Sequence, residues 1–186
     1  MTGIEWILIA IAAIIVIALI VYFNRFVILG QRIDNSLSQI DVQLRKRADL
    51  VPNLVETVKG YAKHEKSIMD KVNEARKAMV GAGSKDIIGK MKAGNVLSNA
   101  IGRLFAVAEN YPQLKANENF LQLQEELSAI EDKIAYARQY YNDSIMSYNT
   151  ACVTFPGSFF ANLYGKKEKE YLKIPEAQKA VPKVSF

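Results

Sequence analysis

The sequence predicts an all-α protein, with an N-terminal transmembrane helix followed by an elongated antiparallel helical bundle of long helices. Three patterns in the 186 residues lead to this prediction. An unbroken apolar run of 18 residues comes first, a heptad repeat of apolar residues follows it, and a further apolar stripe runs from Ala116 to Ala151. Apolar residues at spacings of three and four fall on one face of a helix.

We expect four regions along the chain. They are a short N-terminal segment (1–5), a transmembrane anchor (6–24), a helical bundle domain (25–165) and a charged, mobile tail (166–186). The tail contains Pro175 and Pro182 and is rich in Lys, which is typical of a solvated segment.

The composition excludes most enzyme classes. A net charge of +5 is too small to indicate a nucleic-acid partner. The single Cys excludes an internal disulfide framework and a Cys-rich zinc site, and the single His excludes a His-rich metal centre within one chain. We therefore expect no cofactor and no catalytic or metal-binding residues.

The apolar run extends from Trp6 to Phe23 and lies between Glu5 and Arg25. At ~1.5 Å per residue it measures about 27 Å, close to the hydrocarbon thickness of a bilayer. A cleaved signal peptide is the alternative, but it needs a basic N-terminal region and a small-residue cleavage site, and the sequence has neither. We expect an uncleaved anchor with Trp6, Tyr22, Phe23 and Arg25 at its ends.

Basic residues lie on the C-terminal side of this run, beginning with Arg25 and Arg32. The positive-inside rule then puts the short N-terminus outside and the bundle domain in the cytoplasm. An unpaired Cys152 fits that compartment. The predicted location is the cell membrane, in a single pass.

A heptad seam begins at Ile33, with no long Gly-rich linker after the anchor. It predicts one long helix that continues to about residue 80 as a nearly rigid stalk. One seam position is occupied by Leu37, Leu44, Val51, Val58, Glu65, Val72 and Met79, and the other by Ile33, Ile40, Arg47, Leu54, Tyr61, Ile68 and Ala75.

Pro52 lies inside this seam and removes one backbone donor, so a kink near Ala48 and Asp49 is expected. A true break with a new helix cap near Asp49 is the alternative. We favour the kink because the seam register continues through the proline.

Four glycines between Gly81 and Gly94 predict a turn region over residues 81–95, with a short weak helix inside it. A second helix should follow and end at Pro112, and a third should extend from about Gln113 to Cys152. The apolar segment 159–164 is expected to pack back on the bundle end. Residues 31–80 carry a net charge of +3 and residues 113–155 a net charge of −3, which favours side-by-side packing of the two long helices.

Two long blocks and several short ones resemble the LemA family. The blocks are residues 39–62 (QIDVQLRKRADLVPNLVETVKGYA) and 116–127 (ANENFLQLQEEL), with AYARQ at 135–139, YND at 141–143, YN at 148–149 and FP at 155–156. The resemblance covers residues 1 to about 165. It implies a bacterial-type, membrane-anchored protein with a long-helix bundle domain, and no catalytic activity or cofactor.

The candidate chemical motifs are better explained as structural. His64-Glu65 lacks the second His of a zinc protease helix, and residues 81–85 lack the spacing of a phosphate loop. Cys152 has no base near it in the sequence, so a packed thiol is expected. The tail's lysines could contact anionic lipid, although an ordinary solubilising tail is the simpler interpretation.

A cluster of carboxylates on the third helix consists of Glu125, Glu126, Glu131 and Asp132. Adjacent helical side chains point about 100° apart, so these groups do not share a metal ion without help. We expect a solvated acidic face that meets residues 45–47 or a partner.

Arg47 puts a charge on the seam, where an aliphatic residue would be usual. We expect it to pair with Glu125 or Glu131 and so to fix the register of the helices. The residues expected to determine seam and register are Leu44, Arg47, Pro52, Phe120, Leu127 and Tyr141.

The leading functional hypothesis is a non-enzymatic membrane scaffold that associates with lipid and with further copies of itself. Helices of about 75, 25 and 60 Å would leave part of the long seam uncovered, which favours a homo-oligomer. A regulatory or signalling adaptor that binds another membrane protein is the alternative. A third possibility is an enzyme acting on lipid or a peptidoglycan precursor, which would need a site at Glu125 or Glu126.

Overall fold

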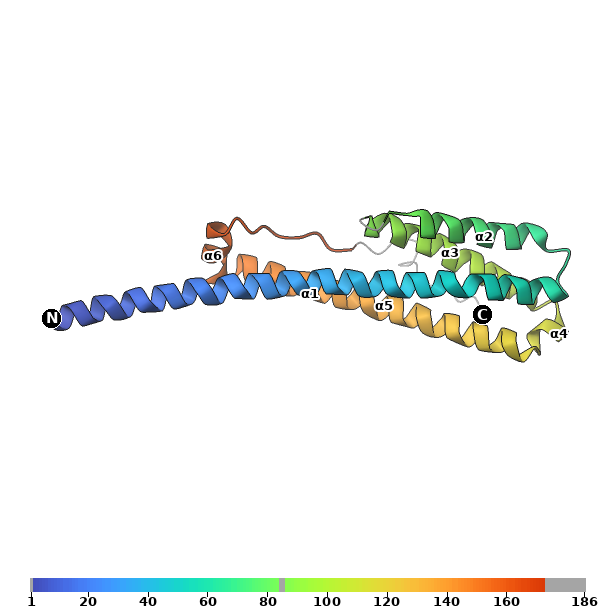
Figure 1. The fold of residues 1–186 in the computed structure, drawn as a ribbon, viewed down its shortest axis with the longest axis horizontal. Helices are drawn as coiled ribbons and strands as arrows, with labels where there is room; N and C mark the ends of the chain where they lie inside the picture. Colours follow the sequence, from blue (N-terminus) through green and yellow to red (C-terminus); the bar gives the residue numbers. More distant parts are fainter. Residues whose placement is uncertain (1, 84–85, 173–186) are drawn as a thin grey trace, which may run out of the picture. The chain divides into compact units, whose positions relative to one another are not determined.

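The computed structural model describes residues 2–83 and 86–172. Over these ranges it is all-α, as predicted, with six helices and no strand. The chain divides into two compact units. Unit 1 consists of residues 1–36 and 138–186, and unit 2 of residues 37–137. Two long helices, α1 (Gly3–Tyr61) and α5 (Glu118–Val153), each contribute one part to either unit (Figure 1).

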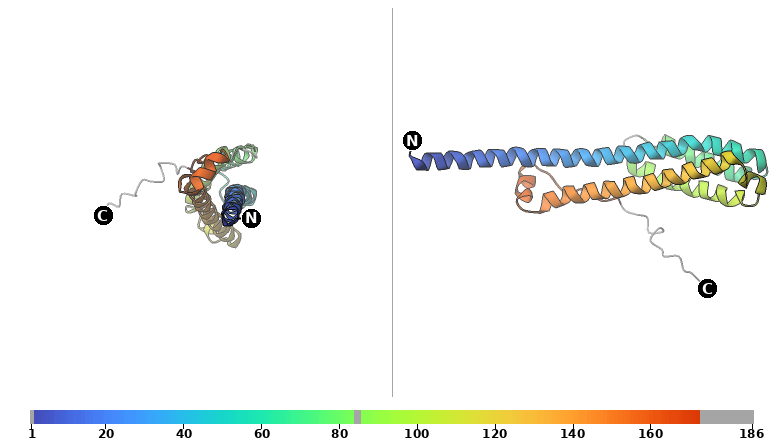
Figure 2. Two further views of the ribbon diagram at one scale, coloured as in Figure 1. Left: turned by 90° about the vertical axis from the view of Figure 1, so that its left-hand side faces the viewer. Right: turned by 90° about the horizontal axis from the view of Figure 1, so that it is seen from below.

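Unit 1 combines the N-terminal part of α1, the C-terminal part of α5 and the short helix α6 (Gly157–Leu163). Figure 2 shows α6 folded back beside α1. The expectation that residues 159–164 pack back on the helices is confirmed, because Phe160 and Ala161 are buried in the core of this unit. The core residues are Phe26, Leu29, Ile33, Ile145, Tyr148, Ala151, Cys152, Phe160 and Ala161.

Unit 2 contains the remaining parts of α1 and α5 together with α2 (Lys66–Gly81), α3 (Ile87–Ala108) and α4 (Pro112–Lys115). Within this unit α2 and α3 lie side by side (Figure 1). Its apolar core is made of residues at the predicted helical spacing. They include Ile40, Leu44, Val51, Leu54, Val58, Val72, Met79, Leu97, Leu104, Phe120, Leu127 and Ile134.

The prediction of one continuous helix from the seam's start to residue 80 is wrong. Helix α1 ends at Tyr61 and α2 begins at Lys66, after a turn in which the Glu65 amide donates to the Ala62 carbonyl at 3.1 Å. Tyr111 Oη donates to Glu65 Oε1 (3.4 Å), and Asn117 Nδ2 donates to Tyr61 Oη (3.0 Å). The same apolar spacing serves a helical hairpin equally well, so the heptad did not reveal the turn.

This turn removes the reason to expect an uncovered seam. Because α2 returns alongside α1 within unit 2, most seam residues from Leu44 to Met79 are buried inside the chain. The exposed members are Tyr61 and, in part, Ile68 and Glu65. An uncovered seam therefore does not support self-association, and any such contact needs another surface.

Helix α1 runs through Pro52 without the break that was considered as an alternative. Proline lacks an N–H group, so the carbonyl of Ala48, four residues earlier, loses its usual donor. Ala48 is fully buried, and Arg76 of α2 supplies the missing donor through an Nε–O hydrogen bond of 2.8 Å. The proline thus creates an acceptor that ties α2 to α1.

We predict that Arg76→Ala lowers the free energy of unfolding by ~1–3 kcal/mol, because it removes the side-chain donor to the buried Ala48 carbonyl. In a Pro52→Ala background the new backbone N–H can bond that carbonyl, so the same substitution should cost less. A double-mutant cycle by denaturant unfolding measures this coupling. Strictly additive effects would contradict the assignment.

The predicted turn over residues 81–95 is shorter than expected. Helix α3 begins at Ile87, where the Asp86 carboxylate caps it by accepting the Gly89 amide at 2.8 Å. Gly94 lies inside α3 and permits close packing, since a Cβ there would lie 2.6 Å from Cδ2 of Leu44 on α1. The glycines at 89 and 94 therefore belong to the helix and not to a loop.

The third predicted helix is divided near its start. Residues 112–115 form α4, and α5 begins after Asn117, whose Oδ1 accepts the Phe120 amide at 3.0 Å as a helix cap. The C-terminal end at Val153 lies one residue beyond the predicted position.

Candidate functional site

An ion pair between a buried arginine and a partly exposed glutamate joins α1 to α5 inside unit 2. The Arg47 side chain is 2% exposed, and its guanidinium pairs with the Glu131 carboxylate. It also donates to the Gly94 carbonyl of α3 at 3.3 Å, and Ser98 Oγ of α3 donates to Glu131 at 3.0 Å. The predicted pairing of Arg47 with a carboxylate of the third helix is confirmed for Glu131, not Glu125. Its role in setting register stays a prediction.

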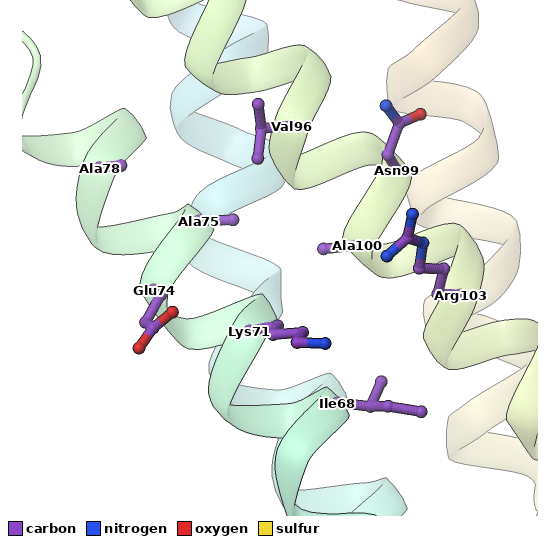
Figure 3. Close-up of a pocket in the computed structure, with 9 residues that line it drawn as sticks. All are labelled: Ile68, Lys71, Glu74, Ala75, Ala78, Val96, Asn99, Ala100 and Arg103. Atoms are coloured by element: carbon purple, nitrogen blue, oxygen red, sulfur yellow. The ribbon is translucent and has the colours of Figure 1, made fainter.

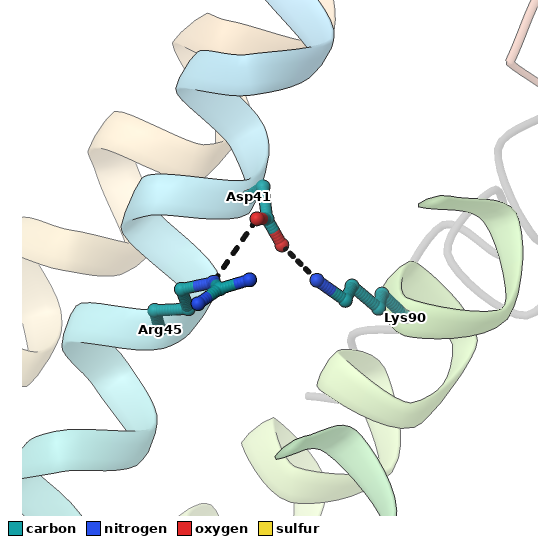
Figure 4. A network of polar contacts seen from close by, with 3 residues as sticks. All are labelled: Asp41, Arg45 and Lys90. Atoms are coloured by element: carbon teal, nitrogen blue, oxygen red, sulfur yellow. Dashed lines mark hydrogen bonds and ion pairs between the residues drawn. The ribbon is translucent and has the colours of Figure 1, made fainter. Parts of the chain in front are cut away.

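A second ionic cluster lies near the first on α1. Asp41 accepts hydrogen bonds from Lys90 Nζ at 2.6 Å and from Arg45 Nε at 3.0 Å (Figure 4). Burial by itself would raise the pKa of Asp41. The hydrogen bond and charge of Lys90, helped by Arg45, outweigh burial and hold the pKa of this carboxyl below its usual value.

This lowered pKa predicts an acid-sensitive contact. A carboxyl whose pKa is lower when folded stabilises the protein above its unfolded pKa of about 4, and that stabilisation is lost as pH falls through the folded pKa. The gap in unfolding free energy between wild type and Asp41→Asn should therefore be largest near neutral pH and shrink in acid. Chemical denaturation at several pH values measures it, and a gap that does not change with pH would contradict this assignment.

Both clusters link α1 to other helices of the unit, and each buried charge has a partner. Such pairs add little net stability compared with apolar residues, but they penalise alternative packings that would leave a charge stranded. The other predicted register residues in this unit follow the apolar pattern. Leu44, Phe120 and Leu127 are buried, and Pro52 is exposed.

The remaining carboxylates of the α5 cluster are exposed. Glu125, Glu126 and Asp132 face solvent, and Glu126 accepts a hydrogen bond from Gln122 at 2.9 Å. Among the described residues, no group of three or more His, Cys, Asp or Glu side chains is placed to hold a metal ion. Of the expected contact with residues 45–47, the structure shows the Arg47–Glu131 pair.

A groove of about 680 Å³ lies between α2 and α3, and we call it the α2–α3 groove. In Figure 3, Ala75 and Ala100 point toward each other across it, while Ile68 and Lys71 reach from α2 toward α3. Glu74 lies on the side of α2 that faces away from α3. The lining residues are Ile68, Lys71, Glu74, Ala75, Ala78, Val96, Asn99, Ala100 and Arg103.

The predicted anchor residues lie in unit 1. Trp6 is exposed, with the rest of the apolar run around it. Tyr22 stacks on Phe160 of α6 with ring centroids 4.4 Å apart, and the Arg25 guanidinium lies 6.0 Å from the Tyr22 centroid. Phe23 meets Tyr164 edge to face at 5.6 Å. The C-terminal end of the run is therefore packed partly against protein.

Helix α1 is long and apolar enough to cross a membrane, and its most apolar 18-residue window is not covered by the rest of the chain. Its N-terminus carries Glu5, whose carboxylate accepts the Thr2 amide at 2.9 Å. No other helix among the described residues meets the same test of length and composition.

Two asparagines of α5 hold the chain after α6, and the sequence interpretation missed them. Asn149 donates to the Lys169 carbonyl (2.9 Å) and accepts its amide (2.8 Å). Asn142 makes the same pair of bonds with Leu172, at 3.4 and 3.0 Å. The available signal was the Tyr-Asn pair repeated after seven residues, at 141–142 and 148–149. The predicted mobile tail is thus held in place over residues 166–172, and the rest of it lies outside the described residues.

The two other residues singled out in this unit have structural roles. Tyr141 is half-buried, and its burial, together with the Asp34 charge, raises its pKa. Cys152 is buried, as expected for a packed thiol. Burial raises the pKa of its thiol and the nearby Glu168 carboxylate adds to this, so the thiol stays neutral.

We predict that Asn149→Ala frees the segment around Lys169 and exposes Cys152. Thiol alkylation at neutral pH, slow in the wild type, should then accelerate without loss of helix content by circular dichroism. Asn162→Ala, at an exposed position of α6, is the matched control. Equal alkylation rates in all three proteins would contradict the proposed clamp.

The LemA family sequence model matches residues 36–186, which is most of the chain. This chain belongs to the LemA family. The match extends past residue 165, the expected limit of the resemblance, and includes the segment clamped by Asn142 and Asn149. The signature block at residues 39–62 contains Asp41, Arg47 and Pro52, which are the ionic and proline features of α1 described above.

Curated relatives of this LemA family chain include two kinds of protein. Magnetosome protein MamQ of Magnetospirillum gryphiswaldense is 29% identical over 82% of this chain and 65% of its own length. Protein LemA of Metamycoplasma hominis is 26% identical over 66% of the chain and 56% of its own length. The chain thus spans less than two thirds of either relative. Together with the exposed apolar part of α1, these relatives indicate a membrane-associated protein.

Proposed function

We propose that this LemA family protein is a non-enzymatic, single-pass membrane scaffold whose cytoplasmic helices bind further copies of the same chain. The observation that carries the proposal is a pair of complementary surfaces in unit 2. One is the α2–α3 groove and the other is an acidic stripe on α5. Membership of the family and the membrane-compatible α1 support the location.

The groove suits an approaching helix. Three of its lining residues are alanines (Ala75, Ala78 and Ala100), whose small side chains let the backbone of another helix come close. Two cations, Lys71 and Arg103, stand on its two sides, and the carboxylate of Glu74 points away from α3. Overall α2 and α3 carry seven basic side chains and two acidic ones.

The occupant we assign is the exposed face of α5 from a second copy. Its residues recur at spacings of three and four, so they share one side of the helix. This acidic stripe consists of Glu118, Leu121, Glu125, Ser128, Asp132 and Tyr136, all of them exposed. Glu125 and Asp132 flank the small Ser128, so two carboxylates can meet Lys71 and Arg103 while the small side chains face the alanines of the groove.

Charge favours contact between the groove and the stripe over contact between two grooves or between two stripes. The part of α5 in unit 2 carries five acidic side chains and one basic one, opposite to α2 and α3. Because the groove and the stripe are different surfaces, each copy can bind two neighbours, and the contact extends into a ring or an open array. Anchoring in one membrane raises the local concentration of the surfaces, so a weak contact suffices.

The test is a charge swap in the full-length protein, read out as particle mass in mild detergent. Glu125→Lys with Asp132→Lys should reduce assembly, and so should Lys71→Glu with Arg103→Glu. The chain that carries all four substitutions should assemble again, as should an equal mixture of the two double variants. Matched controls on other exposed faces are Asp49→Lys with Glu56→Lys and Lys66→Glu with Lys77→Glu.

Loss of assembly in both double variants and recovery in the swapped chain would support the contact. Assemblies that survive both reversals, or a swapped chain that is helical but stays monomeric, would contradict it. Circular dichroism of each variant separates a lost contact from a lost fold.

A regulatory adaptor is the second candidate. The mixed lining of the groove, with Asn99 beside the cations, is typical of exchangeable contacts with a polar rim. In that case the purified wild type is a monomer, and Lys71→Glu with Arg103→Glu removes a co-purifying membrane protein.

A further inference from the structure

Helix α6 and the residues just before it present large apolar side chains that remain exposed among the described residues of unit 1. Phe155, just before it, is 88% exposed, Phe159 is 63% exposed and Leu163 is 57% exposed. The opposite side of the same helix is buried through Phe160 and Ala161. A seven-residue helix that exposes this much apolar surface is expected to meet another apolar phase.

The contacts of α6 place it at one end of the apolar run. Tyr164 Oη donates to the Leu19 carbonyl at 2.7 Å, and Phe160 stacks on Tyr22. The Phe23–Tyr164 ring contact adds a third connection to the same turn of α1. The apolar run from Trp6 to Phe23 spans about 27 Å, close to the hydrocarbon thickness of a bilayer. Helix α6 is thus level with the boundary between hydrocarbon and headgroups.

We infer that α6 and Phe155 form an interfacial lipid-binding element, in which Phe155, Phe159 and Leu163 insert among the headgroups of the leaflet where the span ends. The inference rests on the membrane-spanning part of the proposed function and not on self-association. Phe and Leu side chains on the apolar face of an interfacial helix are buried at the boundary between headgroups and acyl chains. Lys166 and Lys167, which begin three residues after the end of α6, and Arg25 on α1 supply cations for anionic headgroups.

This arrangement has a mechanical consequence. A span alone can slide or tilt in the bilayer, whereas a side element packed against its end fixes the depth of the helix. The stacking of Tyr22 on Phe160 would transmit that constraint to α1. Unit 1 would then set the position of the chain relative to the membrane surface.

Tryptophan fluorescence of the full-length protein in lipid vesicles tests the inference, because Trp6 is the chain's only tryptophan. In a Trp6→Phe background, Phe159→Trp places the indole on α6, and Val42→Trp places one on an exposed face of α1, outside both proposed association surfaces, as a control. Vesicles of zwitterionic and anionic lipid carry bromine either near the carboxyl end or near the methyl end of the acyl chains.

The F159W indole should emit at shorter wavelength than the V42W indole. It should lose emission in brominated vesicles, more with bromine near the carboxyl end, whereas the V42W indole should lose none. Suppose that Trp6 is quenched in the parent chain but the indole of a helical F159W protein is not. That result would overturn the inference while leaving the membrane span intact. Absence of quenching at Trp6 itself would overturn the span and the inference together. Neither result depends on whether copies associate.

Discussion

Glu131→Leu should destabilise the protein far more than Arg47→Leu, although the two residues form one ion pair. The reason is their unequal burial, because the Arg47 side chain is 2% exposed and that of Glu131 is 47% exposed. Removing Glu131 takes the carboxylate partner away from a buried guanidinium, and loss of one partner from a buried pair costs about 3–5 kcal/mol. Removing Arg47 leaves a carboxylate that water can reach, at a cost of ~1 kcal/mol or less.

The double variant Arg47→Leu with Glu131→Leu should recover most of the stability, since two apolar residues replace the pair. Denaturant unfolding of the three variants measures the asymmetry, with Glu126→Leu as the control for an exposed carboxylate on the same helix. Equal effects of the two single variants would contradict the burial argument. If Arg47→Leu changes neither stability nor assembly state, the pair does not set register.

Gly157→Ala should be the most damaging small substitution in unit 1. A Cβ at this position would fall inside van der Waals contact with the carbonyl oxygen of Ala151, which is helix backbone and cannot rotate away. Overpacking of this kind costs about 1–3 kcal/mol or more. Because Gly157 opens α6, the strain should displace α6 from Tyr22 and Phe26 and not only lower the free energy of unfolding.

The measurement combines thermal unfolding with the exposure of Cys152, which lies in the same core. We expect faster alkylation and a lower Tm for Gly157→Ala. Gly102→Ala is the matched control, since a Cβ there meets nothing within 4 Å and favours the helix. A Gly157→Ala protein as stable as the wild type would show that α6 can shift at no cost.

The sequence predicted which residues are buried better than it predicted where the helices end. Leu44, Val72 and Met79 lie in the core as their spacing required, yet the turn after Tyr61 divides the helix on which they were placed. A heptad encodes the buried face of a helix, and an antiparallel hairpin of two such helices shows the same repeat. The turn is specified by hydrogen bonds from Tyr111 and Asn117, which come from distant parts of the chain.

In the candidate sites, too, features set by the local sequence pattern could be predicted, and contacts between distant parts of the chain could not. Arg47 could be predicted from the sequence because its charge interrupts an apolar seam, and its expected partners were two carboxylates. Arg76 could not be predicted as the donor to Ala48, because that contact requires α2 to lie beside α1. The clamps at Asn142 and Asn149 were equally hidden, since their partners are backbone groups that no side chain reveals.

The proposed scaffold role depends most directly on how many copies of the chain associate. The decisive measurement is the mass of the full-length protein, extracted gently into mild detergent or lipid nanodiscs, with any co-purifying protein identified. The proposal predicts particles made of several copies of this chain alone, held together by the acidic stripe and the α2–α3 groove. A monodisperse monomer, or a single copy bound to a different membrane protein, would contradict it.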